Sequence, residues 1–194
     1  MAVLALLPTL FLADHTARAQ AAPTAIQPLR LSAFGGVTGT YTNFNGGKNA
    51  GLTLGGDLTF QTVPYVRPSL ELRGTAPFDS GKIDRQINFL IGPKVEYPWH
   101  RFHPYGDLLF GRGLITFLHG GYPQNGLLYV SSGTAVYSFG MGVDYDLTNR
   151  WAAKADFQLQ HWHTPITGAS TIYPKAITFG VVYHFDFNNR RRQR

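Results

Sequence analysis

The sequence contains no cysteine, so disulfide bonds, thiolate catalysis and cysteine-based metal sites are all excluded. Charged residues are also scarce, making up 14% of the 194 residues, whereas a typical soluble domain has roughly 25%. No segment approaches the roughly 18 consecutive apolar residues that a membrane-spanning helix needs. If the chain enters a membrane, it must therefore do so as a β-barrel.

Aromatic residues and glycine are abundant. Aromatics make up 14% of the chain, and there are 22 glycines. Few charges together with many aromatics disfavour a disordered chain and favour a sheet that exposes aromatic rings to an apolar environment. The length predicts a single domain.

The net charge of +6 is concentrated at the C-terminal end, where four arginines fall within the last five residues: Arg190, Arg191, Arg192 and Arg194. The rest of the chain carries only +2 once these four are subtracted. No basic helix or basic patch interleaved with aromatics accompanies them. The sequence therefore does not predict nucleic-acid binding.

An apolar run at the N-terminal end, Val3–Ala13, is followed by small residues around Ala19-Gln20-Ala21. This pattern predicts a secretory signal peptide over residues 1–21, with Ala17-Arg18-Ala19 as a second candidate cleavage site. No lysine or arginine precedes the run, which departs from the usual pattern. A buried helix or strand is the alternative interpretation, because an apolar run this short is compatible with either.

From residue 29 onward the apolar residues recur with a period of two, which is typical of β-strands. Eight segments have about the 9–11 residues that a tilted membrane strand needs. They are Leu29–Tyr41, Leu52–Gln61, Val66–Gly74, Gln86–Tyr97, Phe102–Gly111, Ala135–Asp146, Trp151–Trp162 and Lys175–Phe185.

One face of these segments is apolar along its whole length, and the other carries charges of both signs. In Val66–Gly74, for example, Leu70 and Leu72 alternate with Glu71 and Arg73. A soluble barrel would have its charges outside and its apolar residues inside. The observed alternation instead predicts an apolar exterior around a polar lumen.

Short and long connections alternate strictly along the chain. The short ones are Gln61–Tyr65, Pro98–Arg101 and Leu147–Arg150, and the long ones are Thr42–Gly51, Thr75–Arg85, Arg112–Thr134 and His163–Pro174. Short periplasmic turns and longer extracellular loops are typical of outer-membrane barrels. Aromatic residues gather near the short turns, as an interfacial girdle does: Phe60, Tyr65, Tyr97, Trp99, Phe102, Tyr145, Trp151, Tyr183 and Phe185.

The last predicted strand ends in Thr178-Phe179-Gly180-Val181-Val182-Tyr183-His184-Phe185. It resembles the C-terminal β-signal of outer-membrane proteins, with Thr178, Gly180, Tyr183 and Phe185 at the motif positions. The whole pattern is similar to that of the small eight-stranded OmpA/OmpX-like barrels. This resemblance implies insertion by the barrel-assembly machinery, contact with outer-membrane lipid, and location in the bacterial outer membrane.

The fold predicted for residues 29–185 is therefore an all-β, eight-stranded, antiparallel up-and-down transmembrane β-barrel. Residues 186–194 follow the terminal Phe of the motif, which is usually the last residue, and are predicted to form a basic periplasmic tail. The lumen of an eight-stranded barrel is just wide enough for side chains to fill it. Buried charges must be paired, so we expect a charge network of Asp57, Arg67, Glu71, Arg73, Lys94, Glu96, Asp107, Asp144, Lys154 and Asp156.

No catalytic, cofactor or metal site is predicted. His161 and His163 fall on one side of a strand at a spacing that a metal site could use, but no third ligand is identifiable. An interfacial aromatic cluster around Trp162 is the favoured interpretation. No local Ser/His/acid arrangement predicts the nucleophile and base of a lipid-modifying enzyme; residues distant in the sequence could still meet in the fold.

The sequence thus favours a non-enzymatic outer-membrane barrel with a structural or surface-interaction role. A narrow solute-transport barrel and a lipid-modifying enzyme are the alternatives. The longest loop, Arg112–Thr134, contains two tyrosines and five glycines, among them Gly120, Gly121 and Gly126, and is where recognition of an extracellular partner would reside.

Overall fold

The computed structural model describes residues 29–60, 65–78, 84–124, 126–164 and 170–185, so the predicted signal peptide (1–21) and basic tail (186–194) lie outside it. Within these ranges no helix is long and apolar enough to cross a membrane. Eight long strands form the main sheet: β1 (Leu29–Tyr41), β2 (Lys48–Phe60), β3 (Arg67–Pro77), β4 (Asp84–Glu96), β5 (Phe102–Phe117), β8 (Ser131–Asp146), β9 (Trp151–His163) and β11 (Lys175–Phe185).

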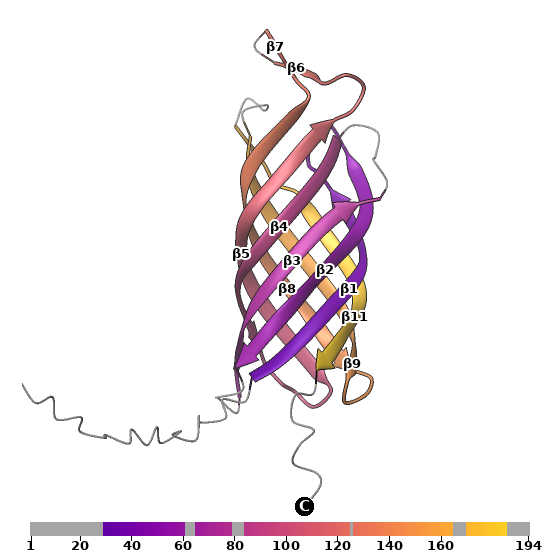
Figure 1. The fold of residues 1–194 in the computed structure, drawn as a ribbon, viewed down its shortest axis with the longest axis vertical. Coiled ribbons are helices and arrows are strands. Elements are labelled where there is room, and N and C mark those ends of the chain that lie inside the picture. The colour runs from indigo at the N-terminus through magenta and orange to yellow at the C-terminus, as the bar shows by residue number, and fades with distance from the viewer. Residues whose placement is uncertain (1–28, 61–64, 79–83, 125, 165–169, 186–194) are drawn as a thin grey trace, which may run out of the picture.

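Each long strand pairs antiparallel with the next one along the chain, and β1 also pairs with β11. The sheet is therefore a closed ring of tilted strands (Figure 1). Closure leaves no long strand with a free edge, which is the condition for placing a sheet in lipid. This confirms the predicted eight-stranded antiparallel barrel.

The period of two in the sequence becomes an alternation of buried and exposed side chains. Along β4 every second residue from Asp84 to Lys94 is buried in the lumen, and Phe89, Ile91 and Val95 lie exposed on the outside. The exterior is apolar because these outward residues are mainly leucine, valine, isoleucine and aromatics. Lumen-facing and lipid-facing residues alternate in this way in membrane barrels.

The strands are longer at their extracellular ends than the sequence analysis predicts. β2 begins at Lys48 rather than Leu52, β5 ends at Phe117 rather than Gly111, and β8 begins at Ser131 rather than Ala135. These three extensions, 48–51, 112–117 and 131–134, were expected to belong to loops. Pairing with the neighbouring strand keeps them extended: Tyr41 pairs with Lys48, for example.

Two extracellular connections are long, as predicted: residues 118–130 join β5 to β8, and residues 164–174 join β9 to β11. The predicted strict alternation is wrong for the other two, because the β1–β2 and β3–β4 connections (42–47 and 78–83) are no longer than the β2–β3 connection (61–66) once the strand ends have extended. At the periplasmic end, Trp99 and Phe102 exchange two backbone hydrogen bonds of 2.9 Å across a tight turn. At the extracellular end, β5 and β8 are joined by a small hairpin of β6 (Tyr122–Gln124) and β7 (Leu127–Tyr129), which extends beyond the barrel (Figure 1). The two-residue strand β10 (Thr171–Ile172) pairs with the end of β9.

Two glycines face each other where the ring closes. Gly36 of β1 pairs directly with Gly180 of β11. A Cβ atom at Gly36 would lie 2.5 Å from the carbonyl oxygen of Phe179 and 2.8 Å from the Cα atom of Gly180. The two strands can approach this closely only because neither position carries a side chain.

We therefore expect Gly36→Ala to lower the free energy of unfolding by about 1–3 kcal/mol, since the added methyl group overpacks the β1–β11 contact. Urea titration of the protein in lipid vesicles measures this. Gly39→Ala is the matched control on the same strand, because a Cβ there meets nothing within 4 Å. Equal stability of the two variants would contradict this account of the closure.

Candidate functional site

Eight charged side chains from six strands meet in the middle of the lumen, and each is buried. They form the central charge cluster, which consists of Asp57, Glu71, Arg73, Lys94, Asp107, Asp144, Lys154 and Asp156. All eight belong to the ten residues that the sequence analysis places in a lumen network. They converge because their positions share the inward face of β2, β3, β4, β5, β8 and β9.

Arg73 bridges the cluster from one wall to the other. Its Nη1 atom lies 2.6 Å from Asp156 Oδ1 on β9, and its Nη2 atom lies 2.6 Å from Glu71 Oε1 on β3. Tyr105 adds a hydrogen bond of 2.8 Å from its hydroxyl to Asp156. The bridge ties strands that are far apart in the ring and occupies the lumen axis with a guanidinium group.

The two lysines occupy the remaining space. Lys94 Nζ lies 3.2 Å from Asp57 and 3.6 Å from both Glu71 and Asp144. Lys154 Nζ lies 3.4 Å from Asp144. Both ammonium groups also lie 4.1 Å from the centre of the Tyr105 ring, within the range of a cation–π interaction.

Asp107 differs from the other carboxylates. It accepts hydrogen bonds of 3.0 and 3.2 Å from the Gln158 amide, and it forms no ion pair with any of the described residues. The cluster has five carboxylates and three cationic side chains, so it carries two excess negative charges if every group is ionised. Asp107 is the carboxylate that the cations compensate least.

A second cluster lies at the periplasmic end of the lumen. It contains Arg67 and Glu96, the other two predicted network residues, whose charged groups are 3.4 Å apart. His103 Nδ1 lies 2.8 Å from Glu96, and His103 Nε2 lies 3.1 Å from Asp146. The predicted network therefore divides into a central cluster and a half-buried periplasmic one.

The extracellular half of the lumen has two different walls. On one wall, four threonine hydroxyls form a chain of hydrogen bonds across β11, β1, β2 and β3: Thr178 to Thr38 at 2.8 Å, Thr38 to Thr53 at 2.5 Å and Thr53 to Thr75 at 2.9 Å. The opposite wall is mainly apolar, with Asn88 and Gln160 hydrogen-bonded to each other among its side chains. The threonine chain satisfies polar groups that would otherwise be buried without partners.

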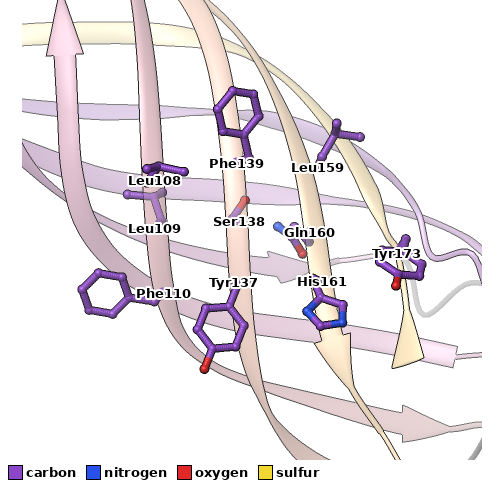
Figure 2. Close-up of a pocket in the computed structure, with 10 residues that line it drawn as sticks. All are labelled: Leu108, Leu109, Phe110, Tyr137, Ser138, Phe139, Leu159, Gln160, His161 and Tyr173. Atoms are coloured by element: carbon purple, nitrogen blue, oxygen red, sulfur yellow. The ribbon is translucent and has the colours of Figure 1, made fainter. Parts of the chain in front are cut away.

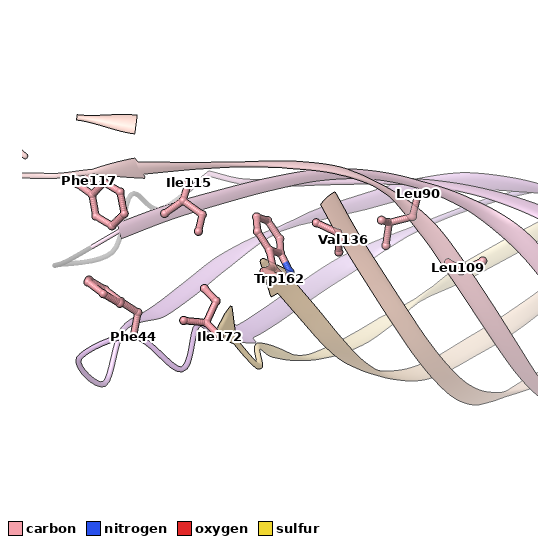
Figure 3. Close-up of a cluster of buried hydrophobic side chains, with 8 residues drawn as sticks. All are labelled: Phe44, Leu90, Leu109, Ile115, Phe117, Val136, Trp162 and Ile172. Atoms are coloured by element: carbon pink, nitrogen blue, oxygen red, sulfur yellow. The ribbon is translucent and has the colours of Figure 1, made fainter. Parts of the chain in front are cut away.

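The apolar wall is a cluster of eight buried side chains (Figure 3): Phe44, Leu90, Leu109, Ile115, Phe117, Val136, Trp162 and Ile172. Trp162 is its largest member and is fully buried, with its ring nitrogen donating a 2.8 Å hydrogen bond to Gln160. The sequence analysis was wrong to place Trp162 in an interfacial cluster with His161 and His163. Its position on β9 alternates with the histidines, so it points into the lumen.

Aromatic rings cover the extracellular mouth of the lumen. Phe44, in the loop between β1 and β2, has its ring 5.6 Å from that of Phe117 and 5.1 Å from that of Tyr122 at the base of the hairpin. Tyr129, on the other hairpin strand, also packs against the apolar cluster. From mouth to periplasm, the lumen thus contains aromatic rings, apolar side chains, the central charge cluster and the periplasmic cluster.

The hairpin rises from this covered mouth. Its tip exposes Leu127 and Leu128, and Val130 is exposed just beyond β7. Gly121 precedes β6 with a φ of 109°, a backbone conformation that favours glycine. A substantial apolar surface is therefore held outside the barrel by a base that packs on the mouth.

The four residues of the predicted assembly signal divide between the two faces of β11. Thr178 and Gly180 face the lumen, where they contact β1. Tyr183 lies on the outside, and its ring is 4.9 Å from Trp151 and 5.0 Å from Phe185. The motif residues thus have structural roles in the closed barrel besides any role in assembly.

No metal site emerges among the described residues, where no group of three His, Cys, Asp or Glu side chains is placed to hold an ion. His161 instead lies between two tyrosine rings, 6.3 Å from Tyr137 and 5.2 Å from Tyr173. His163 lies exposed at the end of β9. The aromatic cluster predicted for this region exists, but it is built from the tyrosines and excludes Trp162.

Several residues that complete the lumen were not predicted from the sequence. Four of them carry no charge and one is a histidine: Phe34, Tyr105, Gln158, Trp162 and His103. All occupy inward positions of their strands, so strict alternation could have identified them. A search restricted to Asp, Glu, Lys and Arg passes over them.

A closed eight-stranded barrel with an apolar exterior, aromatic rings near its short turns and a charged lumen is an integral outer-membrane β-barrel protein. The chain belongs to the family described as outer membrane protein beta-barrel domain, whose model matches residues 3–185. A comparison with curated proteins found no match.

Solved structures share the fold at low sequence identity. Neisserial surface protein A (NspA) is 12% identical with a TM-score of 0.51, and Ail, the attachment invasion locus protein of Yersinia pestis, is 12% identical with a TM-score of 0.53. Each match covers 81% of this chain and 97% of the other. Ail was also solved in complex with the heparin analogue sucrose octasulfate; that structure has 11% identity and a TM-score of 0.52.

We expect Arg73→Met to lower the free energy of unfolding by about 3–5 kcal/mol, because it leaves Asp156 and Glu71 buried without their main cation. Asp107→Asn should leave that free energy unchanged or raise it, since Asp107 contributes excess negative charge and Asn can still accept from Gln158. Urea titration in lipid vesicles compares the two variants. Equal destabilisation by both would show that the charges are not organised around Arg73.

Proposed function

We propose that this protein is a non-enzymatic outer-membrane barrel that contacts an extracellular surface through the β6–β7 hairpin. The observation that carries the proposal is the exposed apolar tip of that hairpin, which stands above a filled lumen. The barrel acts as the rigid support, and the hairpin supplies the contact.

The filled lumen argues against transport. Aqueous channels are found in barrels of 16–18 strands, whereas eight strands leave room only for side chains or one small ligand. Here Trp162, Arg73 and Lys94 are all buried within the lumen. A solute would have to displace both the apolar cluster and a network of buried ion pairs, and breaking such a pair costs several kcal/mol.

The hairpin has the properties expected of a contact site. Leu127, Leu128 and Val130 are each more than half exposed. Leu127 and Leu128 lie on β7, which projects from the barrel (Figure 1), and Val130 follows β7, where its carbonyl oxygen accepts a hydrogen bond from Phe117 at the end of β5. Exposed apolar patches on protein surfaces commonly mark interaction sites. Because Tyr122 and Tyr129 pack on the mouth, the hairpin is held in place and less ordering entropy is lost on contact.

The names of two structural neighbours are consistent with a role at the cell surface. NspA is a surface protein, and Ail is an attachment protein whose structure includes a heparin analogue. Their low identity to this chain supports the shared fold alone. We therefore take from them the use of a small barrel as a platform at the cell surface, and no ligand.

A lipid-modifying enzyme is less well supported. Such an enzyme needs a nucleophile and a base within hydrogen-bond reach of each other. On the outer surface of the described strands, His161 contacts the rings of Tyr137 and Tyr173 rather than a serine or a carboxylate. A serine, a histidine and a carboxylate do meet at the periplasmic end of the lumen, where Ser32 Oγ lies 2.9 Å from His184 Nδ1 and His184 Nε2 lies 3.8 Å from Asp146 Oδ1. Ser32 is buried in the lumen, away from the outer surface that faces lipid. All the described aspartate and glutamate side chains are buried or half-buried.

We further propose that the chain is exported with a cleaved signal peptide at residues 1–21 and inserted by the barrel-assembly machinery. Support for export comes from the apolar run with its small-residue cleavage motif. Support for insertion comes from Tyr183 and Phe185, which lie at the periplasmic end of the closing strand, where the β-signal pattern places them.

Changing Leu127, Leu128 and Val130 together to serine should reduce adhesion several-fold in cells that display the protein. The measurement is the retention of expressing cells on alkyl-coated and hydroxyl-coated glass under flow. Because the proposed contact is apolar, we expect the loss of adhesion on the alkyl-coated glass and not on the hydroxyl-coated glass. Leu147→Ser at the periplasmic turn is the control, since it removes an exposed leucine from the opposite end. Adhesion that does not change in the triple variant would exclude the hairpin as the contact.

A further inference from the structure

The outer surface of the barrel has a groove of about 390 Å³ across β5, β8 and β9 (Figure 2). Its wall is formed by outward side chains of these strands, and Tyr173 closes one side. The groove is not part of the lumen, and neither the filled lumen nor the hairpin accounts for it.

Strand pairing orders the groove in parallel rows. Leu108, Phe139 and Leu159 form one row, because Leu108 pairs with Phe139 and Phe139 pairs with Leu159. The next row toward the extracellular end contains Phe110 and Tyr137, with His161 beside them. Along the strands the groove thus changes from aliphatic and phenyl groups to aromatic groups that carry polar atoms.

A third row lies beyond these two and is basic. Arg112 pairs with Ala135, and Val136, the next residue of β8, pairs with Trp162. His163 follows Trp162 and so lies one residue beyond this last pair, on the same side as Ala135. The hydroxyl of Thr134 donates to the carbonyl oxygen of His163, which holds the two strands together there. Arg112 and His163 are both exposed on the outer surface.

The small side chain of Ala135 leaves a gap between the two basic residues. Their Cα atoms are two strand spacings apart, or about 10 Å. An arginine and a histidine can both reach a phosphate group placed between them at that separation. Arg112 forms no ion pair with any described residue, and none of the described carboxylates is exposed on the outside to compete for it.

We propose that this groove binds one phosphorylated lipid of the outer leaflet. An acyl chain lies along the rows of Leu108 and Phe110, and the phosphate is held over Ala135 by Arg112 and His163. Arginine suits this task because its guanidinium forms paired, charge-assisted hydrogen bonds with phosphate oxygens. Tyr137 and Tyr173 provide the aromatic groups that favour the boundary between hydrocarbon and headgroups. The proposal is independent of the surface role of the hairpin.

Native mass spectrometry of the protein released from detergent micelles tests the site, with lipid A and chemically dephosphorylated lipid A as probes. The two probes have the same acyl chains, so retention of the phosphorylated form alone reports headgroup binding. We expect one lipid A molecule to remain bound at collision energies that remove the dephosphorylated form. Equal retention of the two lipids would overturn the proposal. Retention of inorganic phosphate at the same collision energies as lipid A would overturn it as well.

The double variant Arg112→Gln/His163→Gln should lower lipid A retention at least tenfold. His100→Gln/Arg101→Gln is the matched control, because it removes an exposed histidine and arginine at the periplasmic turn. Ala135→Leu keeps both basic residues and fills the gap between them, so it should lose retention as well. The shift in electrophoretic mobility on boiling verifies that each variant is folded. Unchanged retention in folded Arg112→Gln/His163→Gln, or an equal loss in the control, would contradict the site.

Discussion

Hydrogen bonding between β1 and β11 closes the sheet, and the rest of the molecule depends on that closure. In hydrocarbon every backbone donor and acceptor needs a protein partner, and the ring provides one along all eight long strands. Closure also separates two environments that the chain uses differently. Along each strand, every second residue faces lipid on the outside, and the residues between them face a narrow enclosed space on the inside. The contact of Gly36 with Gly180 lets the first and last strands meet closely enough to achieve this.

The narrow interior explains why so many charges are tolerated. Charges taken out of water need partners at close range. Arg73 lies 2.6 Å from Asp156 across the lumen and 2.6 Å from Glu71 on its own strand. Nearer the extracellular mouth, Trp162 and its apolar neighbours fill the space instead. Buried side chains therefore occupy the lumen from the mouth to the periplasmic end. The two proposed contact sites, the hairpin above the mouth and the groove that faces lipid, both lie outside it.

The sequence predicted much of this architecture because alternation records which environment each residue faces. All eight strands and all ten lumen charges were placed on that basis. Eight of these charges are buried in the lumen, and Arg67 and Glu96 are half-buried at its periplasmic end. The extracellular strand ends were missed because Lys48–Gly51 resembles a turn and is extended only through pairing with β1. Trp162 was not predicted to lie in the lumen because its two histidine neighbours suggested a position at the membrane–water interface. The groove and its basic row depend on the register between three strands, which composition does not encode.

Single-channel recording in planar lipid bilayers tests the central claim of a filled lumen most directly. The account predicts no stepwise current for the folded protein, and openings only when Trp162→Ala is combined with Arg73→Met, which together remove the largest apolar side chain and the central bridge. Regular openings in the unmodified protein would contradict the account and would favour a narrow transport barrel.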